Sequence, residues 1–234
     1  MEHEHEGLDR REIPQRSARW ATRAADALAA AGLTPNGISI LSVAIALGAA
    51  AAFLGAGLAD AALRPWLLVA AAILMPLRLL CNMLDGMLAV EHGLSTPEGD
   101  LFNEVPDRIA DLAILAAAGY ATCGVWRLGD HDLGTALGWA AGAIAVLTAY
   151  VRTLGAANGV GNFFDGLMPK PLRMWALVAA CLVSLAEAPL GWPLGIVLAV
   201  ALAAIALGSA QTVAVRLGRI TRALRARAAG GAGR

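Results

Sequence analysis

The chain has 234 residues, of which 58% are hydrophobic and only 15% charged, and its formal net charge is zero at pH 7. A soluble domain usually carries about a quarter charged residues, so the composition argues against a soluble protein. The neutral balance gives no support for nucleic acid as a partner. The charges are also unevenly placed, because arginines gather near both ends while long interior stretches carry almost none.

Apolar stretches long enough to cross a bilayer recur along the chain. A spanning helix needs roughly 20 apolar residues, and the stretches that qualify are about 37–58, 66–90, 100–123, 134–156, 171–187 and 193–215. We therefore predict an all-α, polytopic membrane protein with six transmembrane helices. Their high content of small residues favours close helix packing in lipid.

The segment before the first predicted span mixes arginines with Trp20, Leu28 and several alanines. This pattern is typical of an amphipathic helix in the membrane interface. We expect a cytoplasmic N-terminus with this interfacial helix over 1–32, a transmembrane domain over 33–215, and a basic cytoplasmic tail over 216–234. The arginine-rich ends predict that both termini are cytoplasmic, in the inner membrane of the cell. Topogenic charge and specific lipid binding both remain open as explanations for the arginines.

Polar side chains are concentrated at the cytoplasmic ends of the second and third predicted spans. Such groups are costly inside a membrane, so each is a candidate for function. The cluster contains Arg78, Asn82, Asp85, Asp100, Asn103, Glu104, Asp107, Arg108 and Asp111. Asn82 and Asp85 are three residues apart and share one helix face. A second stripe, at intervals of four, consists of Asn103, Asp107 and Asp111.

The two polar stripes are expected to meet. The loop between the second and third spans is short, so the spans should be antiparallel neighbours whose cytoplasmic ends converge. Several acids with few bases require a further cation, and oxygen ligands without His or Cys predict Mg²⁺, Mn²⁺ or Ca²⁺. Gly86 and Gly99 leave room for a ligand close to the backbone. A buried ion-pair network that ties the helices together is the alternative interpretation.

One stretch of the chain has a recognisable order of acids, amides and glycines. It reads Asn82-Met-Leu-Asp85-Gly86-Met-Leu-Ala89-Val90, then eight residues, Gly99, three residues, Asn103, three residues, Asp107. This resembles the signature of the CDP-alcohol phosphotransferase family, Asp-x-x-Asp-Gly-x-x-Ala-Arg, eight residues, Gly-x-x-x-Asp-x-x-x-Asp. Every spacing is met. The resemblance also implies the family architecture, which is six spans preceded by an interfacial helix.

Three positions depart from the signature: Asn82 and Asn103 replace aspartates, and Val90 replaces arginine. In the family the first three aspartates contribute to a metal site that holds the CDP pyrophosphate, and the fourth is the proposed base. The resemblance therefore implies Asp107 as the catalytic base. It implies Mg²⁺ or Mn²⁺ bound by Asp85, Asn82, Asn103 and Asp107, with Asp111 as the best-placed compensator for the lost charges. The loss of two carboxylates predicts weaker binding of a divalent pair.

The resemblance implies an integral membrane transferase in phospholipid biosynthesis. It would move a phosphatidyl or related phospho-group from a CDP-linked donor such as CDP-diacylglycerol to an alcohol acceptor, with release of CMP. The expected substrate-binding residues are Gly86, Ala89, Gly99, Thr34, Pro35, Asn36, Lys170 and Arg173. For the last two, topogenic charge is the alternative explanation. Membrane lipids are expected partners, and a homodimer is implied by the resemblance alone.

A second hypothesis is a catalytically degenerate family member that binds lipid or acts as a scaffold. It is suggested by Asn82, Asn103 and Val90, which remove charge from the signature. A small transporter is not favoured, because the acids lie at one membrane face and not at the midplane. The sequence leaves the acceptor alcohol and the number of metal ions open.

Overall fold

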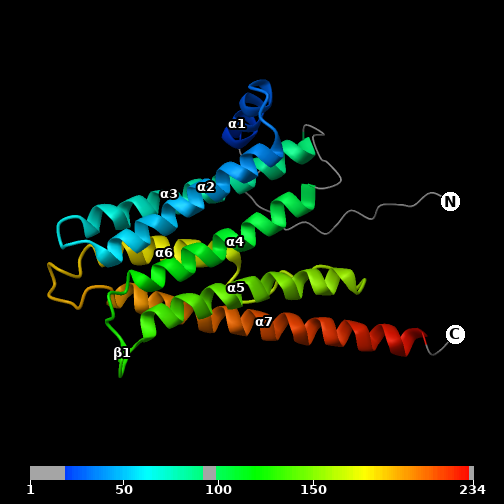
Figure 1. Cartoon of the computed structure of the whole chain (residues 1–234). Coiled ribbons are helices and arrows are strands. Elements are labelled where there is room, and N and C mark those ends of the chain that lie inside the picture. Colours follow the sequence, from blue (N-terminus) through cyan, green and yellow to red (C-terminus); the bar gives the residue numbers. More distant parts are fainter. Residues whose placement is uncertain (1–18, 92–98, 232–234) are drawn as a thin grey trace.

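The computed structural model describes residues 19–91 and 99–231, without the side chains of Asp100, Phe102 and Asn103. Within these residues the chain is all-helical apart from one hairpin of two-residue strands, as the sequence predicts. The helices are α1 (Arg19–Ala30), α2 (Pro35–Leu58), α3 (Arg64–Glu91), α4 (Gly99–Tyr120), α5 (Leu133–Ala157), α6 (Lys170–Ser184) and α7 (Ile196–Gly231). The strands are β1 (Arg127–Leu128) and β2 (His131–Asp132). Figure 1 shows α2 to α7 running lengthwise in an elongated bundle, with α1 at one end.

The helices α2 to α7 fall on the apolar stretches of the sequence. Within the described residues, four are long and apolar enough to cross a membrane: α2, α3, α5 and α7. The helix α4 carries five charged residues, and α6 has only 15 residues, about 22 Å at 1.5 Å per residue. The count of six spans therefore stays a prediction.

The last helix extends beyond the predicted transmembrane domain. The basic tail expected from residue 216 begins as a continuation of α7, which runs without a break to Gly231. The reason is composition, because Ala, Leu and Arg are strong helix formers and α7 contains no proline. The arginines from Arg216 to Arg227 therefore lie on an extension of the last helix.

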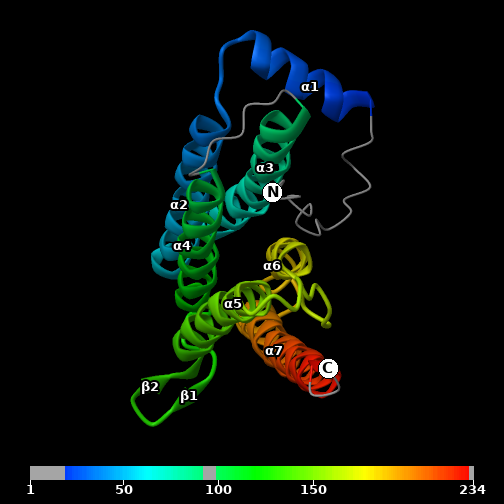
Figure 2. The same ribbon diagram turned by 90° about the vertical axis from the view of Figure 1, so that its right-hand side faces the viewer.

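The helix α2 packs against both α3 and α4, while α5 packs against α4 and α7, and α6 against α3 and α7. Figure 2 looks along the bundle and shows α2 beside α4. The expectation that α3 and α4 are packed neighbours therefore needs correction, since α2 is the helix that holds them together. Polar side chains of α3 and α4 nevertheless meet near the end of the bundle that carries α1.

Small residues set the spacing of the helices, and the core is rich in alanine. One close approach joins α4 to α5, where a Cβ added at Gly138 would lie 2.7 Å from the Cα of Gly119. Since real Cβ atoms do not approach that closely, both positions require glycine. This is the small-residue packing expected for helices in lipid.

The helix α1 packs by one face. Its residues Ala21 and Ala25 are fully buried in a cluster that includes Met87 and Leu88 of α3. Exposed arginines lie on the other side of α1, so buried and exposed positions alternate with a helical period. The placement of this helix in a membrane interface stays a prediction, and residues 1–18 lie outside the described residues.

At the opposite end of the bundle, a buried arginine connects several helices. This residue was not identified from the sequence. Arg64 donates hydrogen bonds to the carbonyls of Ala56 and Ala121, each at 2.9 Å. Its guanidinium lies 3.8 Å from the carboxylate of Glu187. Glu187 in turn accepts the backbone N–H of Gly195 at 2.8 Å. These contacts tie α3 to the ends of α2 and α4 and to the α6–α7 connection.

Candidate active site

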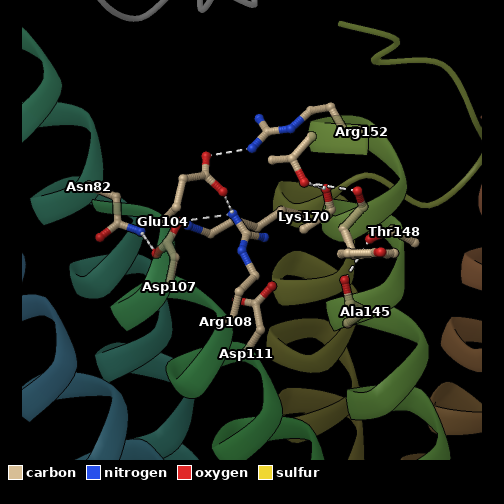
Figure 3. Close-up of polar contacts among 12 residues, drawn as sticks. Asn82, Glu104, Asp107, Arg108, Asp111, Ala145, Thr148, Arg152 and Lys170 are labelled. Atoms are coloured by element: carbon tan, nitrogen blue, oxygen red, sulfur yellow. Dashed lines mark hydrogen bonds and ion pairs between the residues drawn. The ribbon is translucent and has the colours of Figure 1, made fainter. Parts of the chain in front are cut away.

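Asp107 of α4 lies where polar side chains from three helices meet. Its Oδ1 accepts hydrogen bonds from Arg78 Nη2 at 3.0 Å and from Asn82 Nδ2 at 2.6 Å. Its Oδ2 is paired with the ammonium group of Lys170, the first residue of α6. Figure 3 shows Asn82 and Lys170 reaching this carboxylate from opposite sides. Both carboxylate oxygens of Asp107 are thus engaged.

Asp111, one turn further along α4, is a fully buried member of the same cluster. Its Oδ1 lies 2.9 Å from Arg78 Nη1, and its Oδ2 accepts a hydrogen bond from Arg173 at 3.1 Å. Arg78 therefore bridges Asp107 and Asp111 with the two ends of one guanidinium. This pairing places Asp111 in an ion-pair network.

Two serines of α2 hold the signature residues of α3. Ser39 donates to Asp85 Oδ2 at 2.8 Å, and Ser42 donates to Asn82 Oδ1 at 2.5 Å. Neither serine was predicted from the sequence. The available signal was a pair of hydroxyl groups three residues apart in an otherwise apolar stretch, and such a pair shares one helix face.

Asp85 differs from the other two acids, because one of its oxygens has neither a hydrogen bond nor an ion pair among the described residues. Asp111 Oδ1 also lacks a hydrogen bond, but it lies 2.9 Å from Arg78 Nη1. Asp85 is 3% exposed, and its Oδ1 has no hydrogen-bond partner among the described residues. A buried carboxylate oxygen without a partner is costly, so this atom suits a cation. Asp85 therefore fits the metal-ligand role that the resemblance implies.

The rest of the predicted metal site is less simple. The described residues contain no group of three or more His, Cys, Asp or Glu placed to hold a metal ion. Asp107 and Asp111 already have basic partners, and the side chain of Asn103 lies outside the described residues. Their roles as ligands therefore remain predictions.

The sequence predicted a cluster with several acids and few bases, but the structure places more basic groups there. Three basic side chains, Arg78, Lys170 and Arg173, contact Asp107 and Asp111. The start of α6 supplies two of them, although it lies about 60 residues from these acids. The sequence could not show this proximity, because it depends on how α6 packs.

A second ion-pair group lies at the rim of the cluster. Glu104 accepts a hydrogen bond from Arg108 at 2.6 Å and is also paired with Arg152 of α5. Arg108 lies 4.0 Å from Asp107, which links the two groups. Glu104 is more accessible to solvent than Asp107 and Asp111, with 38% of its side chain exposed. The rim is therefore polar and open, whereas the inner cluster is buried.

The segment before α6 is held in place by α7, and this positions Lys170 and Arg173. Arg216 donates to the carbonyl of Asp165 at 3.0 Å and to that of Thr148 at 2.7 Å. Arg173 itself donates to the carbonyl of Met168 at 2.9 Å. Because Arg173 is buried and both of its terminal nitrogens are hydrogen-bonded, its predicted contact with substrate through those nitrogens requires these interactions to break.

The remaining predicted substrate residues occupy the ends of helices. Thr34 caps α2, since its hydroxyl accepts the backbone N–H of Gly37 at 3.1 Å, and Pro35 is the first residue of that helix. Asn36, Gly86 and Ala89 are half-buried, and Gly99 begins α4. The cap explains Thr34 without a ligand, and the substrate-binding roles of these residues stay predictions.

Comparison with known proteins identifies the family of this chain. No family model matches it. A phosphatidylinositol phosphate synthase from Corynebacterium glutamicum is 30% identical over 190 residues, which cover 79% of this chain and 76% of that protein. The chain belongs to the CDP-alcohol phosphotransferase family. The resemblance seen in residues 82–107 is thereby confirmed at the level of the family.

Solved structures of Mycobacterium tuberculosis phosphatidylinositol phosphate synthase share this fold. The complex with manganese and citrate has a TM-score of 0.69 and 24% identity, over 86% of this chain and 88% of that one. The form with CDP-DAG bound has a TM-score of 0.67 and 23% identity, over 87% and 94%. The helical bundle is therefore the fold of a known lipid-synthesising enzyme.

Proposed function

We propose that the protein transfers a phosphatidyl group from CDP-diacylglycerol to an alcohol acceptor and releases CMP. The observation that carries this proposal is that Asn82 and Lys170 both contact Asp107 at one end of the bundle, with Asp85 three residues after Asn82 on the same helix. Asp85 and Asp107 are signature residues of the family to which the chain belongs. The names of the relatives support an enzyme over a lipid-binding scaffold.

Asp85 is the residue that would hold a divalent metal ion, Mg²⁺ or Mn²⁺, with Asn82 and Asn103 as neutral ligands. The free, buried Oδ1 of Asp85 supports this assignment, as does the manganese in the structure of a relative. Such an ion neutralises charge on the pyrophosphate and on the departing nucleotide. Asn82 is already oriented, because Ser42 donates to its oxygen.

Asp107 is the group that accepts the proton of the incoming hydroxyl. In this structure its Oδ2 is paired with Lys170, so Lys170 must leave before that oxygen can act as a base. A phosphate on the substrate is a strong partner for an ammonium group. Lys170 would therefore bind the substrate anion and release Asp107 in the same movement.

A phosphorylated alcohol is the first acceptor to test. The relatives are named for a phosphatidylinositol phosphate product, and cationic side chains border the site. Arg152 and Arg108 lie on the rim, where Glu104 neutralises only part of their charge. Lys170 lies between this rim and the buried cluster.

We also propose that the enzyme spans the inner membrane six times as a homodimer, with both termini and the active site in the cytoplasm. The order of the helices supports this topology, because the connections after α2, α4 and α6 lie at the end away from α1 (Figure 1). The helix α4 is too polar for a span by composition alone, but its charges are clustered at the site end. The homodimer rests on the family resemblance.

The test is CMP release from CDP-diacylglycerol by detergent-purified protein with Mg²⁺ or Mn²⁺ and a pool of polar acceptors. The wild type should release CMP, and Asp85→Ala should reduce the rate by at least a hundredfold. Asp165→Ala is the matched control, since this acid pairs with Arg219 on the surface. If folded wild type releases no CMP with any acceptor, the transferase assignment is wrong.

A further inference from the structure

Arg78 occupies a position that is unusual for a side chain of its size and charge. It is 0% exposed and lies between two carboxylates one turn apart on α4. Its Nη2 is 3.0 Å from Asp107 Oδ1, and its Nη1 is 2.9 Å from Asp111 Oδ1. A cation that joins one buried and one partly buried acid in this way performs the electrostatic task of a bound metal ion, because opposite charges compensate each other where the dielectric is low.

Asn82 lies one turn after Arg78 on α3 and touches the same carboxylate. Its Nδ2 donates to Asp107 Oδ1 at 2.6 Å, and its Oδ1 accepts from Ser42. An aspartate at this position would place a second anionic oxygen against Asp107, and like charges at that distance repel unless a cation lies between them. With an amide, the two residues hydrogen-bond directly and need no ion to join them.

Asn82, which replaces an acid, and Arg78 therefore both make the site less negative. One removes a negative charge from the site, and the other adds a fixed positive charge on the neighbouring turn of α3. Asp85 stands apart from both, because its contact is the hydroxyl of Ser39 and its Oδ1 has no partner among the described residues. One acid is thus left for a cation, and the other two are paired with basic side chains.

We propose that Arg78, together with Asn82, takes the place of one metal ion, so that this site binds a single divalent cation at Asp85. The inference rests on the proposed function, since it takes the site to be one that uses a divalent cation. It assigns to Arg78 the positioning of Asp107 and Asp111. It also explains how a site with two amides in the signature keeps a balanced charge.

The test is the stoichiometry of Mn²⁺ bound to the detergent-purified full chain, with free Mn²⁺ measured by electron paramagnetic resonance. All variants carry His3→Ala and His5→Ala, because these histidines lie among glutamates and offer Mn²⁺ a separate site. We expect one ion per chain, lost in Asp85→Asn and kept in Asp60→Asn, an acid at the far end of the bundle. Two ions, none, or one that survives Asp85→Asn would overturn the proposal.

A second variant tests the role of Arg78 directly. Arg78→Gln combined with Asn82→Asp removes the fixed cation and restores the acid, so a second equivalent of Mn²⁺ should bind. A double variant that elutes as a folded species but still binds one ion contradicts the proposal. If the double variant does not fold, the stoichiometry of the parent and of Asp85→Asn decides.

The outcome for metal stoichiometry is separate from the outcome for the reaction. CMP release is measured on the same preparations. One Asp85-dependent ion without turnover would refute the proposed function and leave the single-cation site standing. Turnover with two ions per chain would support the proposed function and refute the single-cation site.

Discussion

At the scale of single residues, each of the acids Asp85, Asp107 and Asp111 is held by a partner from another helix. The signature spacing predicted that Asn82 and Asp107 would lie together, and they do, at 2.6 Å. The same spacing could not reveal Ser39, which is 46 residues from Asp85, or Lys170, which is 63 residues from Asp107. Such partners are determined by the packing of α2 and α6 against α3 and α4, and no local pattern records it.

Ser39→Ala should impair the enzyme more than its small change in volume suggests. The substitution removes the hydrogen bond that orients Asp85, and loss of an outer-shell partner typically costs 10–100-fold in metal affinity or activity. We expect kcat/KM for CMP release to fall by about tenfold or more. Ser209→Ala is the control, since the Ser209 hydroxyl is buried without a hydrogen-bond partner. Equal losses in the two variants would show that Ser39 acts only through general stability.

Lys170→Met should raise KM for the anionic substrate and lower kcat. The ammonium group that pairs with Asp107 is lost, and with it the proposed partner of the substrate phosphate. We expect kcat/KM to fall by at least tenfold, on the order of one strong charge-assisted hydrogen bond, with partial recovery in Lys170→Arg. Arg219→Met, which removes a half-exposed arginine, should stay within about twofold. A Lys170→Met variant with unchanged KM would remove Lys170 from substrate binding.

At the scale of elements, apolar runs predicted where helices lie but not where they end. The ends depend on caps and turns, such as Asp132, whose carboxylate accepts the backbone N–H of Gly134 at 2.8 Å and begins α5. The short hairpin before it turns at Gly129, with φ of +59°, a conformation that glycine adopts readily. These signals span only a few residues and are weak beside the hydrophobic pattern, so the hairpin was not predicted.

Two substitutions of glycine by alanine test helix packing, one at the crossing of α4 and α5 and one on α7. They should change the stability of the fold in opposite directions. Gly138→Ala should destabilise the fold by about 1–3 kcal/mol, because the new Cβ would lie 2.8 Å from the carbonyl oxygen of Leu115. Gly218→Ala on α7 should stabilise it by about 0.5–1 kcal/mol, since its Cβ would meet no atom within 4 Å. Thermal unfolding in detergent measures both. A stabilised Gly138→Ala would contradict the tight crossing.

At the scale of the whole molecule, composition and charge placement predicted an all-helical membrane protein. The helical fold is confirmed, and four of its described helices are long and apolar enough to cross a membrane. What composition could not supply is the pairing of helices, since α3 and α4 are adjacent in sequence yet joined by α2. Nor could it reveal the buried Arg64–Glu187 contact that fastens the far end. Both follow from tertiary packing, where partners are distant in sequence.

The proposed topology predicts which cysteine is reachable from outside the cell. Cys123 is exposed near the end of the bundle away from the active site, whereas Cys81 and Cys181 are buried. A membrane-impermeant maleimide added to intact cells with a permeable outer layer should label the wild type, and Cys123→Ser should abolish the labelling. Labelling that appears only after the inner membrane is opened would invert the topology.

The most direct test of the central claim is identification of the lipid product by mass spectrometry. Purified protein is incubated with CDP-diacylglycerol, a divalent metal ion and inositol phosphate or pooled polar acceptors, and Asp107→Ala is run beside the wild type. We predict a new lipid in which the phosphatidyl group is joined to an acceptor, formed in step with CMP and absent from Asp107→Ala. Unchanged CDP-diacylglycerol after incubation with folded wild type, or equal product from Asp107→Ala, would contradict the account.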